Sequence, residues 1–381
     1  MFLNKKILLL IIIILNLLLP FYSFASFQDG LEAAQNNDFD AAYGFWKKSS
    51  DLGDPASQFN IGLLYTMGLG VNQNYKEAFK WFELSASQGL AEAQYHLGLL
   101  YFEGLGVKSS YKDSFYWFKL ASDQNLPEAQ YYLGLHYAKG FDIEKNFSIA
   151  ASLFNSSADQ GLPESQYHLG LLYLNGDGVP QSFKKSLKYY QMASNAGYAE
   201  AQNGLGWLYH NGLGVEKNLN KAISMYELAA KNENEKAQFN LGTIFLNENS
   251  EFYDIWTAIK WFSISAKQGL PEAQHNLASI YFDGVGVVQN FKKAYKWYKS
   301  ASENGLVKSQ NKLSSLYLKG WGVEKDIIKA YMWLNIAAAQ GNLNSKNKRD
   351  IIQNDMTEKE LMKAQSLSVE CMKKKYNDCY N

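Results

Sequence analysis

A repeat with a period of 36 residues constrains this 381-residue chain more than any other feature. The pair Leu97-Gly98 recurs, with close replacements, at steps of 36 residues from position 61 to position 314. An aromatic residue follows three positions later, and a Gly-x-Gly-Val element then occurs in six of the eight units. Fixed periods of roughly 20 to 50 residues are typical of solenoids, in which each unit packs only against its neighbours.

Each unit is predicted to form two helices, because small and apolar residues recur at spacings of three and four in both halves. They are Ala93, Leu97, Gly98, Leu100 and Tyr101 in one first half, and Ala78, Trp81, Phe82 and Ala86 in one second half. The glycines at 104 and 106 therefore join helix to helix with no strand before them. We expect a turn there, since a phosphate-binding loop follows a strand.

The full pattern is A-x-x-x-L-G-x-x-Y-x-x-G-x-G-V, then K-A-x-x-W-[YF]-x-x-A-A-x-x-G. It resembles the Sel1-like repeat (SLR) family, which is related to the tetratricopeptide repeat (TPR). The resemblance covers eight repeats of 36 residues within 56–344; we number them 1 to 8, with Gly62 in repeat 1. It implies an all-α fold, a right-handed α/α superhelical solenoid of about eighteen helices whose first helices line a concave face.

The two flanks of the array are predicted to be helical as well. Residues 27–55 have spacings that resemble a TPR-like helix pair. Within 345–381, Thr357 and Glu360 form a capping-box pattern at the start of a predicted capping helix over 357–375. The two cysteines, Cys371 and Cys379, follow near the chain end. We expect them to form a disulfide that pins the tail, because such pairs are typical of exported proteins.

The first 25 residues have the pattern of a cleaved signal peptide. Lys5 and Lys6 precede an apolar run over 7–19, and Ser23 and Ala25 are the small residues of a cleavage site. An uncleaved N-terminal anchor is the alternative. No later stretch is apolar enough to cross a bilayer, so we expect a periplasmic or secreted protein without a transmembrane segment in the mature chain.

Composition excludes several classes of function. The formal net charge is zero, and Arg349 is the only arginine, which disfavours a nucleic-acid partner. The five histidines form no metal-binding element; His96 and His168 share a repeat position but lie two repeats apart. Ser-x-x-Lys elements begin at 109, 182 and 345, but no Lys-Thr-Gly or Ser-Asp-Asn accompanies them. We therefore expect no catalytic residue, no metal and no cofactor.

The resemblance implies a function, because known members of the family are mostly adaptors that gather proteins into complexes. We expect a non-enzymatic scaffold of the cell envelope or secreted space. A cysteine-rich branch has been credited with β-lactamase activity, so a cell-wall-active hydrolase is one alternative, although the repeats here lack that branch's cysteine pairs. A luminal adaptor in protein quality control is the other.

The predicted binding surface follows from the expectation that first helices line a concave face. The positions three before and one after each recurrent Gly then point into the groove, and from repeat 6 onward they become polar. Tyr and Trp are favoured at interfaces. The alternative is that these side chains pack between neighbouring first helices. The predicted contacts are Tyr95, Leu99, Tyr131, Leu135, Tyr167, Leu171 and Trp207.

Two repeats depart from the glycine pattern. Repeat 3 has Gly140-Phe141-Asp142 in place of the double glycine, and repeat 6 has no glycine in "LNENSEFYDIW". Asn tolerates left-handed backbone, so Asn247 and Asn249 are expected to rescue that turn. We expect an altered loop in repeat 6, and both a functional and a neutral origin are open.

Overall fold

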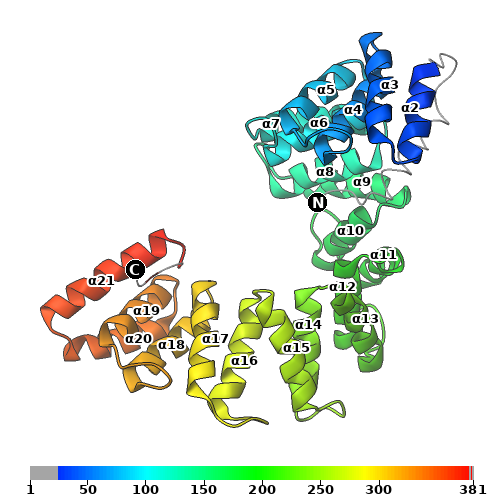
Figure 1. The fold of residues 1–381 in the computed structure, drawn as a ribbon. Helices are drawn as coiled ribbons and strands as arrows, with labels where there is room; N and C mark the ends of the chain where they lie inside the picture. Colours follow the sequence, from blue (N-terminus) through cyan, green and yellow to red (C-terminus); the bar gives the residue numbers. More distant parts are fainter. Residues whose placement is uncertain (1–24, 377–378, 380–381) are drawn as a thin grey trace. The chain divides into compact units, whose positions relative to one another are not determined.

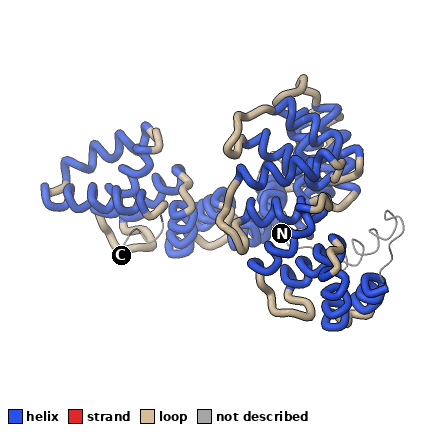
Figure 2. The backbone as a smooth tube through the Cα atoms, turned by 90° about the horizontal axis from the view of Figure 1, so that it is seen from above, coloured by secondary structure: helices blue, strands red, loops and turns tan. Residues whose placement is uncertain are grey.

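The computed structural model describes residues 25–376 and residue 379. Within them it contains twenty α-helices, one short 3-10 helix and no strand (Figures 1 and 2). The predicted all-α fold of packed helix pairs is confirmed, with two helices more than the eighteen expected. The predicted signal peptide lies outside the described residues, apart from Ala25.

The chain divides into two compact units, Met1–Ala196 (unit 1) and Gly197–Asn381 (unit 2), and each is described by itself. In both units, every repeat contributes a first and a second helix of 12 or 13 residues that pack against each other. The helices of unit 1 are α2 (Ala25–Gln35), α3 (Phe39–Asp51), α4 (Pro55–Met67), α5 (Tyr75–Ser87), α6 (Ala91–Glu103), α7 (Tyr111–Asp123), α8 (Pro127–Lys139), α9 (Phe147–Asp159), α10 (Pro163–Asn175) and α11 (Phe183–Asn195).

Unit 2 continues the same alternation and ends with elements outside the repeats. No helix in the described part of either unit is long and apolar enough to cross a membrane. Its elements are α12 (Ala199–Asn211), α13 (Leu219–Lys231), α14 (Glu235–Leu246), α15 (Ile255–Lys267), α16 (Pro271–Asp283), α17 (Phe291–Glu303), α18 (Val307–Lys319), α19 (Ile327–Ala339), α20 (Leu343–Ile352), η2 (Gln353–Asp355) and α21 (Glu358–Lys373).

The helix ends follow from local sequence. In α6, Gly104 takes a left-handed conformation (φ 73°) and its N–H donates to the carbonyl of Leu100, which ends the helix. The next helix, α7, begins when the Ser110 side chain accepts from the backbone N–H of Asp113. The N–H of Ser110 also donates to the Tyr101 carbonyl at 2.9 Å, which closes the connecting turn.

Two recurrent glycines are required by close contacts. A Cβ at Gly98 would lie 2.7 Å from the Phe118 ring, so the first helix can approach the second only without a side chain there. A Cβ at Gly106, where φ is 72°, would lie 2.3 Å from the Tyr75 carbonyl oxygen of the preceding repeat. The Gly-x-Gly element therefore ends one helix and packs against the start of another, as a turn rather than an anion site.

The loops of repeats 3 and 6, which lack the double glycine, form their turns in different ways. In repeat 3, Asp142 takes the left-handed conformation (φ 53°) that the second glycine has elsewhere. In repeat 6, the prediction of left-handed asparagines is wrong: Asn247 is extended (φ −76°, ψ 103°), and no residue of this loop has positive φ. The Asn247 side chain instead accepts from the Asn249 N–H at 3.1 Å, so a side-chain turn replaces the left-handed one.

The C-terminal elements cover the last repeat of unit 2. Thr357 and Glu360 form the predicted capping box, in which each side chain accepts a hydrogen bond from the other's backbone N–H. The helix that follows, α21, packs against α19, whose Trp333 is fully buried. Ala364 on α21 is fully buried as well. Helix α21 lies within the range 357–375 predicted for a capping helix, and it covers apolar surface that the last repeat would otherwise expose.

Candidate protein-interaction face

The predicted contact residues of unit 1 are half-buried and occupy one face of the first helices. They are Tyr95, Tyr131 and Tyr167, three residues before the recurrent Gly, and Leu99, Leu135 and Leu171, one residue after it. The two positions are four residues apart, so each Tyr and the following Leu share one face of their helix. The structure therefore places both predicted positions of each helix together.

The tyrosines lie in a layer of rings that joins consecutive repeats. The ring centre of Tyr131 on α8 is 5.9 Å from that of Phe154 on α9 and 5.5 Å from that of His168 on α10. The same two contacts occur one repeat earlier. Such pairs stabilise by about 0.5–1.5 kcal/mol beyond burial alone. We call this the ring layer: it consists of Tyr95, Phe118, Tyr131, Tyr132, Phe154, Tyr167 and His168.

Burial keeps the histidines of this face uncharged. It lowers the pKa of His96 to about 4 and that of His168 to about 4. Each imidazole is nearly parallel to a phenylalanine of the preceding repeat, with ring centres 5.2 Å apart for His96 and Phe82 and 5.3 Å apart for His168 and Phe154. Sequence analysis did not predict a role for this position. The feature that could have indicated one is that a ring-bearing residue directly follows the recurrent Tyr in repeats 2 to 4, as His96, Tyr132 and His168.

Carboxylates border the same face of unit 1. Glu92, Glu128 and Glu164 occupy the second position of α6, α8 and α10 and are half-buried. Burial raises the pKa of Glu128, and the charges of Glu92 and Glu164 act in the same direction. Burial also raises the pKa of Tyr95 well above its usual range, with Glu128 contributing. The acids therefore place negative charge beside the tyrosines and leucines.

The corresponding face of unit 2 is more polar, although Phe239 keeps the ring contact with the second helix, its ring centre lying 5.8 Å from that of Phe262. Asn240 Nδ2 donates to Asn203 Oδ1 at 2.9 Å, across the positions that Tyr132 and Tyr95 hold in unit 1. Further along, Lys348 Nζ donates to Asn311 Oδ1 at 2.9 Å. Trp207, the predicted contact in this unit, is 40% exposed. Hydrogen bonds thus connect the first helices of unit 2 where rings connect those of unit 1.

Two serines of the Ser-x-x-Lys elements make hydrogen bonds that stabilise the fold. The Ser182 hydroxyl accepts from the Lys185 N–H and caps α11, while the Ser345 hydroxyl accepts from Asn311 at 2.7 Å. In the part of the chain that the structure describes, no group of three or more His, Cys, Asp or Glu side chains is placed to hold a metal ion.

A buried histidine that sequence analysis did not single out lies in repeat 3. His136 is fully buried at a position that is Leu or Ile in the other seven repeats. Its Nε2 is 3.0 Å from the Ser114 hydroxyl, and Ser114 replaces the alanine that most repeats carry at this position. Burial lowers the pKa of His136. In the sequence, this buried pair could have been noticed because both positions, 114 and 136, depart from the repeat pattern.

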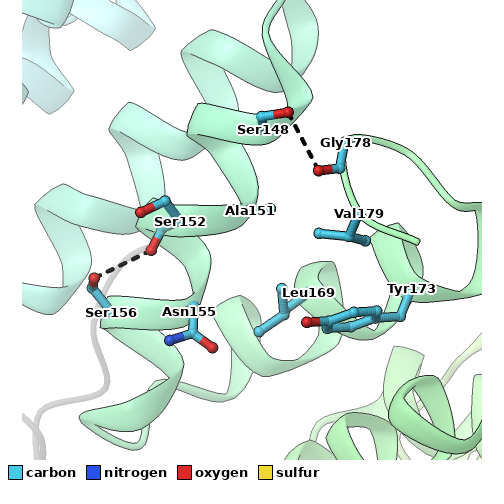
Figure 3. A pocket seen from close by; sticks show the side chains of 9 residues that line it. All are labelled: Ser148, Ala151, Ser152, Asn155, Ser156, Leu169, Tyr173, Gly178 and Val179. Carbon is cyan, nitrogen blue, oxygen red and sulfur yellow. Dashed lines mark hydrogen bonds between the residues drawn. The ribbon is translucent and has the colours of Figure 1, made fainter. Parts of the chain in front are cut away.

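A cavity of about 310 Å³ opens between α9 and α10 (Figure 3). Ala151 and Leu169 form its apolar floor, and Ser152 and Asn155 provide polar groups at its rim. The Tyr173 ring forms one wall. The cavity lies on a different side of α10 from Leu171, because its lining residues Leu169 and Tyr173 are each two positions from Leu171 and residues two apart on a helix point about 200° apart. Sequence analysis did not predict this cavity.

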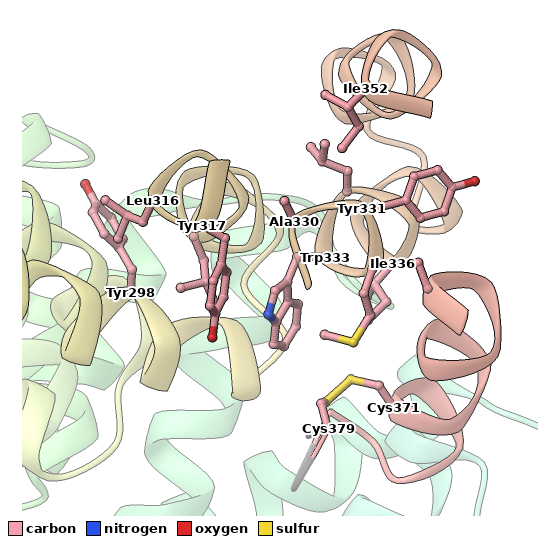
Figure 4. Close-up of a cluster of buried hydrophobic side chains, with 14 of the residues drawn as sticks. Tyr298, Leu316, Tyr317, Ala330, Tyr331, Trp333, Ile336, Ile352, Cys371 and Cys379 are labelled. Atoms are coloured by element: carbon pink, nitrogen blue, oxygen red, sulfur yellow. A yellow bond between two sulfur atoms is a disulfide. The ribbon is translucent and has the colours of Figure 1, made fainter. Parts of the chain in front are cut away.

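The predicted disulfide is present, between Cys371 at the end of α21 and Cys379. Both residues are buried, at 0% and 4% exposure. Figure 4 shows the disulfide facing the buried side chains of α19, beside Trp333 and Ile336. The bond therefore closes over the core of the last repeat and holds the chain end against α21.

Comparison with known protein families identifies the repeat. The model of the Sel1 repeat matches the chain nine times, over 26–54, 55–90, 91–126, 127–162, 163–198, 199–234, 235–270, 271–306 and 307–342. It thus also matches the first helix pair, where the spacings resemble a TPR. No curated protein matches the chain.

Solved structures are similar in fold. One is a protective antigen present in uropathogenic Escherichia coli strains and displaying an SLR fold: identity is 24%, the match covers 100% of this chain and 96% of that chain, and the TM-score is 0.58. Another is a Sel1 repeat protein from Oxalobacter formigenes: identity is 28%, coverage is 63% of this chain and 96% of that chain, and the TM-score is 0.60.

Proposed function

The chain belongs to the Sel1 repeat family, whose members typically serve as protein-interaction scaffolds, and from this premise we propose that it is a non-enzymatic scaffold. Its partner is a protein or peptide segment that lies along the first helices of repeats 2 to 4. The observation that carries the proposal is the half-buried row of Leu99, Leu135 and Leu171, one per repeat. Contacts repeated at this interval suit an extended segment or a helix.

The chemistry of this face favours a partner with both apolar and basic side chains. The leucines and the exposed parts of the tyrosines offer apolar contact, and Glu92, Glu128 and Glu164 offer negative charge beside it. Apolar anchors supply most of the affinity of such interfaces, while complementary charge adds specificity and speeds association. Trp207, at 40% exposure, is proposed as a separate contact on unit 2.

We propose that the scaffold acts in the periplasm or outside the cell. The signal-peptide pattern of 1–25 and the Cys371–Cys379 disulfide support this location, because disulfides persist in oxidising compartments. Two measurements test it. N-terminal sequencing of the mature protein should begin at Ser26, and thiol titration under non-reducing conditions should find no free cysteine. Retention of residues 1–25 would instead indicate an anchor.

Site-specific photo-crosslinking tests the binding face. A photoreactive amino acid at Leu135 should give one discrete adduct in the exporting cell, whereas the same probe at Lys119, an exposed residue of second helix α7, should give none. The Leu99→Ser and Leu171→Ser changes together should weaken the Leu135 adduct at least tenfold. They should shift thermal unfolding little, because these side chains are already half-exposed.

The enzymatic alternative has its own test. Purified mature protein should leave nitrocefin and peptidoglycan unchanged, since no catalytic constellation lies on the described faces. Turnover that survives further purification and is lost on mutation of Ser182 or Ser345 would replace the scaffold proposal with a hydrolase.

A further inference from the structure

Along the array, the fifth residue of the second helix faces a tyrosine or phenylalanine of the next repeat. Phe79 of α5 meets Tyr101 of α6 with ring centres 5.4 Å apart and ring planes at 80°. Phe115 meets Tyr137 at 5.7 Å and 72°. The first helix pair and repeat 7 place a tyrosine at the same position, with the same perpendicular geometry. This contact is thus a regular part of the packing between repeats.

Repeat 3 lacks the side chain that makes this contact. Its fifth residue is Ala151, where the other pairs have Phe, Tyr, Leu or Ile. The tyrosine that it faces, Tyr173, is still present in α10. The cavity of Figure 3 lies at this point, lined by both residues. It is therefore the space from which one large side chain of the repeat pattern is missing, and we call it the Ala151 notch.

The surroundings of Tyr173 indicate which contact is missing. Lys185 Nζ lies 4.7 Å from the centre of the Tyr173 ring, and the Tyr189 ring lies parallel to it at 5.7 Å. Both residues are on α11, so contacts with the ring face are already made there. The perpendicular contact that Phe79 and Phe115 make in their repeats is the one left open.

We propose that the Ala151 notch binds an aromatic side chain presented by a partner polypeptide. The notch has an apolar floor of Ala151, Leu169 and Val179, and its volume of about 310 Å³ accommodates one ring. The packing of the other repeats identifies the occupant, because the protein itself fills the equivalent space with Phe or Tyr. The exposed Ser152 hydroxyl suits the backbone of the segment that carries the ring, while the Asn155 amide is already hydrogen-bonded to Asp159 and Tyr189.

A tyrosine side chain is the preferred occupant. Where the array places tyrosines on both sides of this contact, their hydroxyls meet: the oxygens of Tyr295 and Tyr317 are 2.9 Å apart. A tyrosine entering the notch would meet the Tyr173 hydroxyl in the same way. The notch lies on a different side of α10 from Leu171, so this proposal and the proposed first-helix binding face succeed or fail separately.

Methyl NMR of the mature protein tests the proposal with N-acetyl-L-tyrosinamide as the probe. The Ala151, Leu169 and Val179 methyl signals should shift and saturate at concentrations on the order of millimolar, because a single small ring makes few contacts. Ala151→Phe should raise the unfolding midpoint and weaken binding at least tenfold, since it restores the ring of the other repeats. If the Ala151→Phe variant does not fold, Ala151→Leu fills the notch with a smaller side chain and should also weaken binding.

A converse variant should create a second notch. Phe79→Ala should produce a new saturable response near Tyr101, and Phe79→Leu, which keeps the space filled, should not. Absence of any shift at Ala151, unchanged binding in the Ala151→Phe and Ala151→Leu variants, or a response to methyl glucoside instead of the tyrosine probe would overturn the proposal. So would sedimentation that showed a dimer abolished by Ala151→Phe, because the occupant would then be a second copy of this chain.

Discussion

Unit 1 and unit 2 repeat the same helix pair but connect their first helices differently. In unit 1 the contact between consecutive first helices is made by rings, as in Tyr131 and His168. In unit 2 hydrogen bonds make this contact, as in Asn203 with Asn240, in His275 with Ser309 and in Lys348 with Asn311. Most of the glycines and helix caps that set the backbone repeat occur in both units, while the surface residues differ.

The two faces also differ in charge. The second residue of the first helices is Glu92, Glu128 and Glu164 in repeats 2 to 4 of unit 1. In unit 2 the same position alternates between acid and base, as Glu200, Lys236, Glu272 and Lys308. The face of unit 1 therefore offers a row of one charge sign and that of unit 2 a mixed row, which favour partners with different charge patterns. The comparison teaches that one repeat fold carries two chemically distinct surfaces.

The largest expected effect comes from removing rings in unit 1. Tyr131→Ala with Tyr167→Ala should lower the free energy of unfolding by about 4 kcal/mol or more, because each truncation removes buried ring contacts. The matched change in unit 2, Asn203→Ala with Asn240→Ala, should cost about 1 kcal/mol, as one hydrogen-bonded pair is lost. Urea unfolding of both variants measures this. Equal losses would show that the ring layer adds no more stability than the amides.

Acidification should affect unit 1 through its buried histidines. His96, His136 and His168 are neutral when folded and have lowered pKa values, whereas the unfolded chain takes up protons below about pH 6.5. Their contribution to stability is therefore complete above about pH 6.5 and is lost as the pH falls below it, down to about 4 for His96 and His168. The loss should be at most about 3 kcal/mol each for His96 and His168, and His136 adds to it in the same direction.

The variant His136→Leu with Ser114→Ala, which adopts the residues of other repeats, tests this pH dependence. The free energy of unfolding should fall less between pH 7 and pH 4.5 than in the unchanged protein. The control His210→Gln, at a half-buried position of unit 2, should alter the slope less. A slope unchanged by the His136 variant would assign the acid sensitivity to other groups.

Removing the disulfide should weaken the end of unit 2 and leave unit 1 unaffected. Replacing Cys371 and Cys379 by Ala should cost roughly 2–3 kcal/mol, because the bond closes a short loop and restricts the unfolded chain modestly. Hydrogen exchange should speed up in α21 and α19, which pack together. Faster exchange throughout unit 1 would mean instead that the two units unfold together.

The sequence predicted the helix pair well because its determinants are local. The period, the glycine that ends each first helix and the caps that begin each second helix all lie within a few residues of the ends they set, as in Gly104 and Ser110. The capping box at Thr357 and the disulfide were predictable for the same reason.

The details of the candidate sites depend on contacts between repeats, which one repeat's pattern does not contain. The half-burial of Tyr131 depends on Phe154 and His168 from two other helices. In the sequence, the Ala151 notch could be seen only as a small residue at a repeat position where the other helix pairs have a large one. To predict a cavity there, one must also know that this position faces Tyr173 of the next repeat. In repeat 6, Asn247 had two ways to turn the chain, and sequence alone favoured the wrong one.

The smallest expected effect is a gain of stability in unit 1. In repeats 1 to 3 a glutamine that ends the second helix donates to a glutamine of the first helix, as Gln124 Nε2 does to Gln94 Oε1 at 2.8 Å. In repeat 4 the donor is replaced by Ala196, and Gln166 Oε1 is buried with no hydrogen-bond partner. An unpartnered buried acceptor is destabilising by about 1–3 kcal/mol, part of which a new donor recovers.

Ala196→Gln should therefore raise the free energy of unfolding by about 1 kcal/mol. The backbone already suits the change, because Ala196 has nearly the same conformation (φ −80°, ψ 2°) as Gln160 at the end of α9 (φ −84°, ψ 0°). The matched control Gln124→Ala, which removes an existing donor, should lower stability by a similar amount. Combining Ala196→Gln with Gln166→Leu should cancel the gain, since the acceptor is then absent. A gain that survives in the double variant would mean that the introduced glutamine acts through helix propensity or solvation and not through the hydrogen bond that repeat 4 lacks.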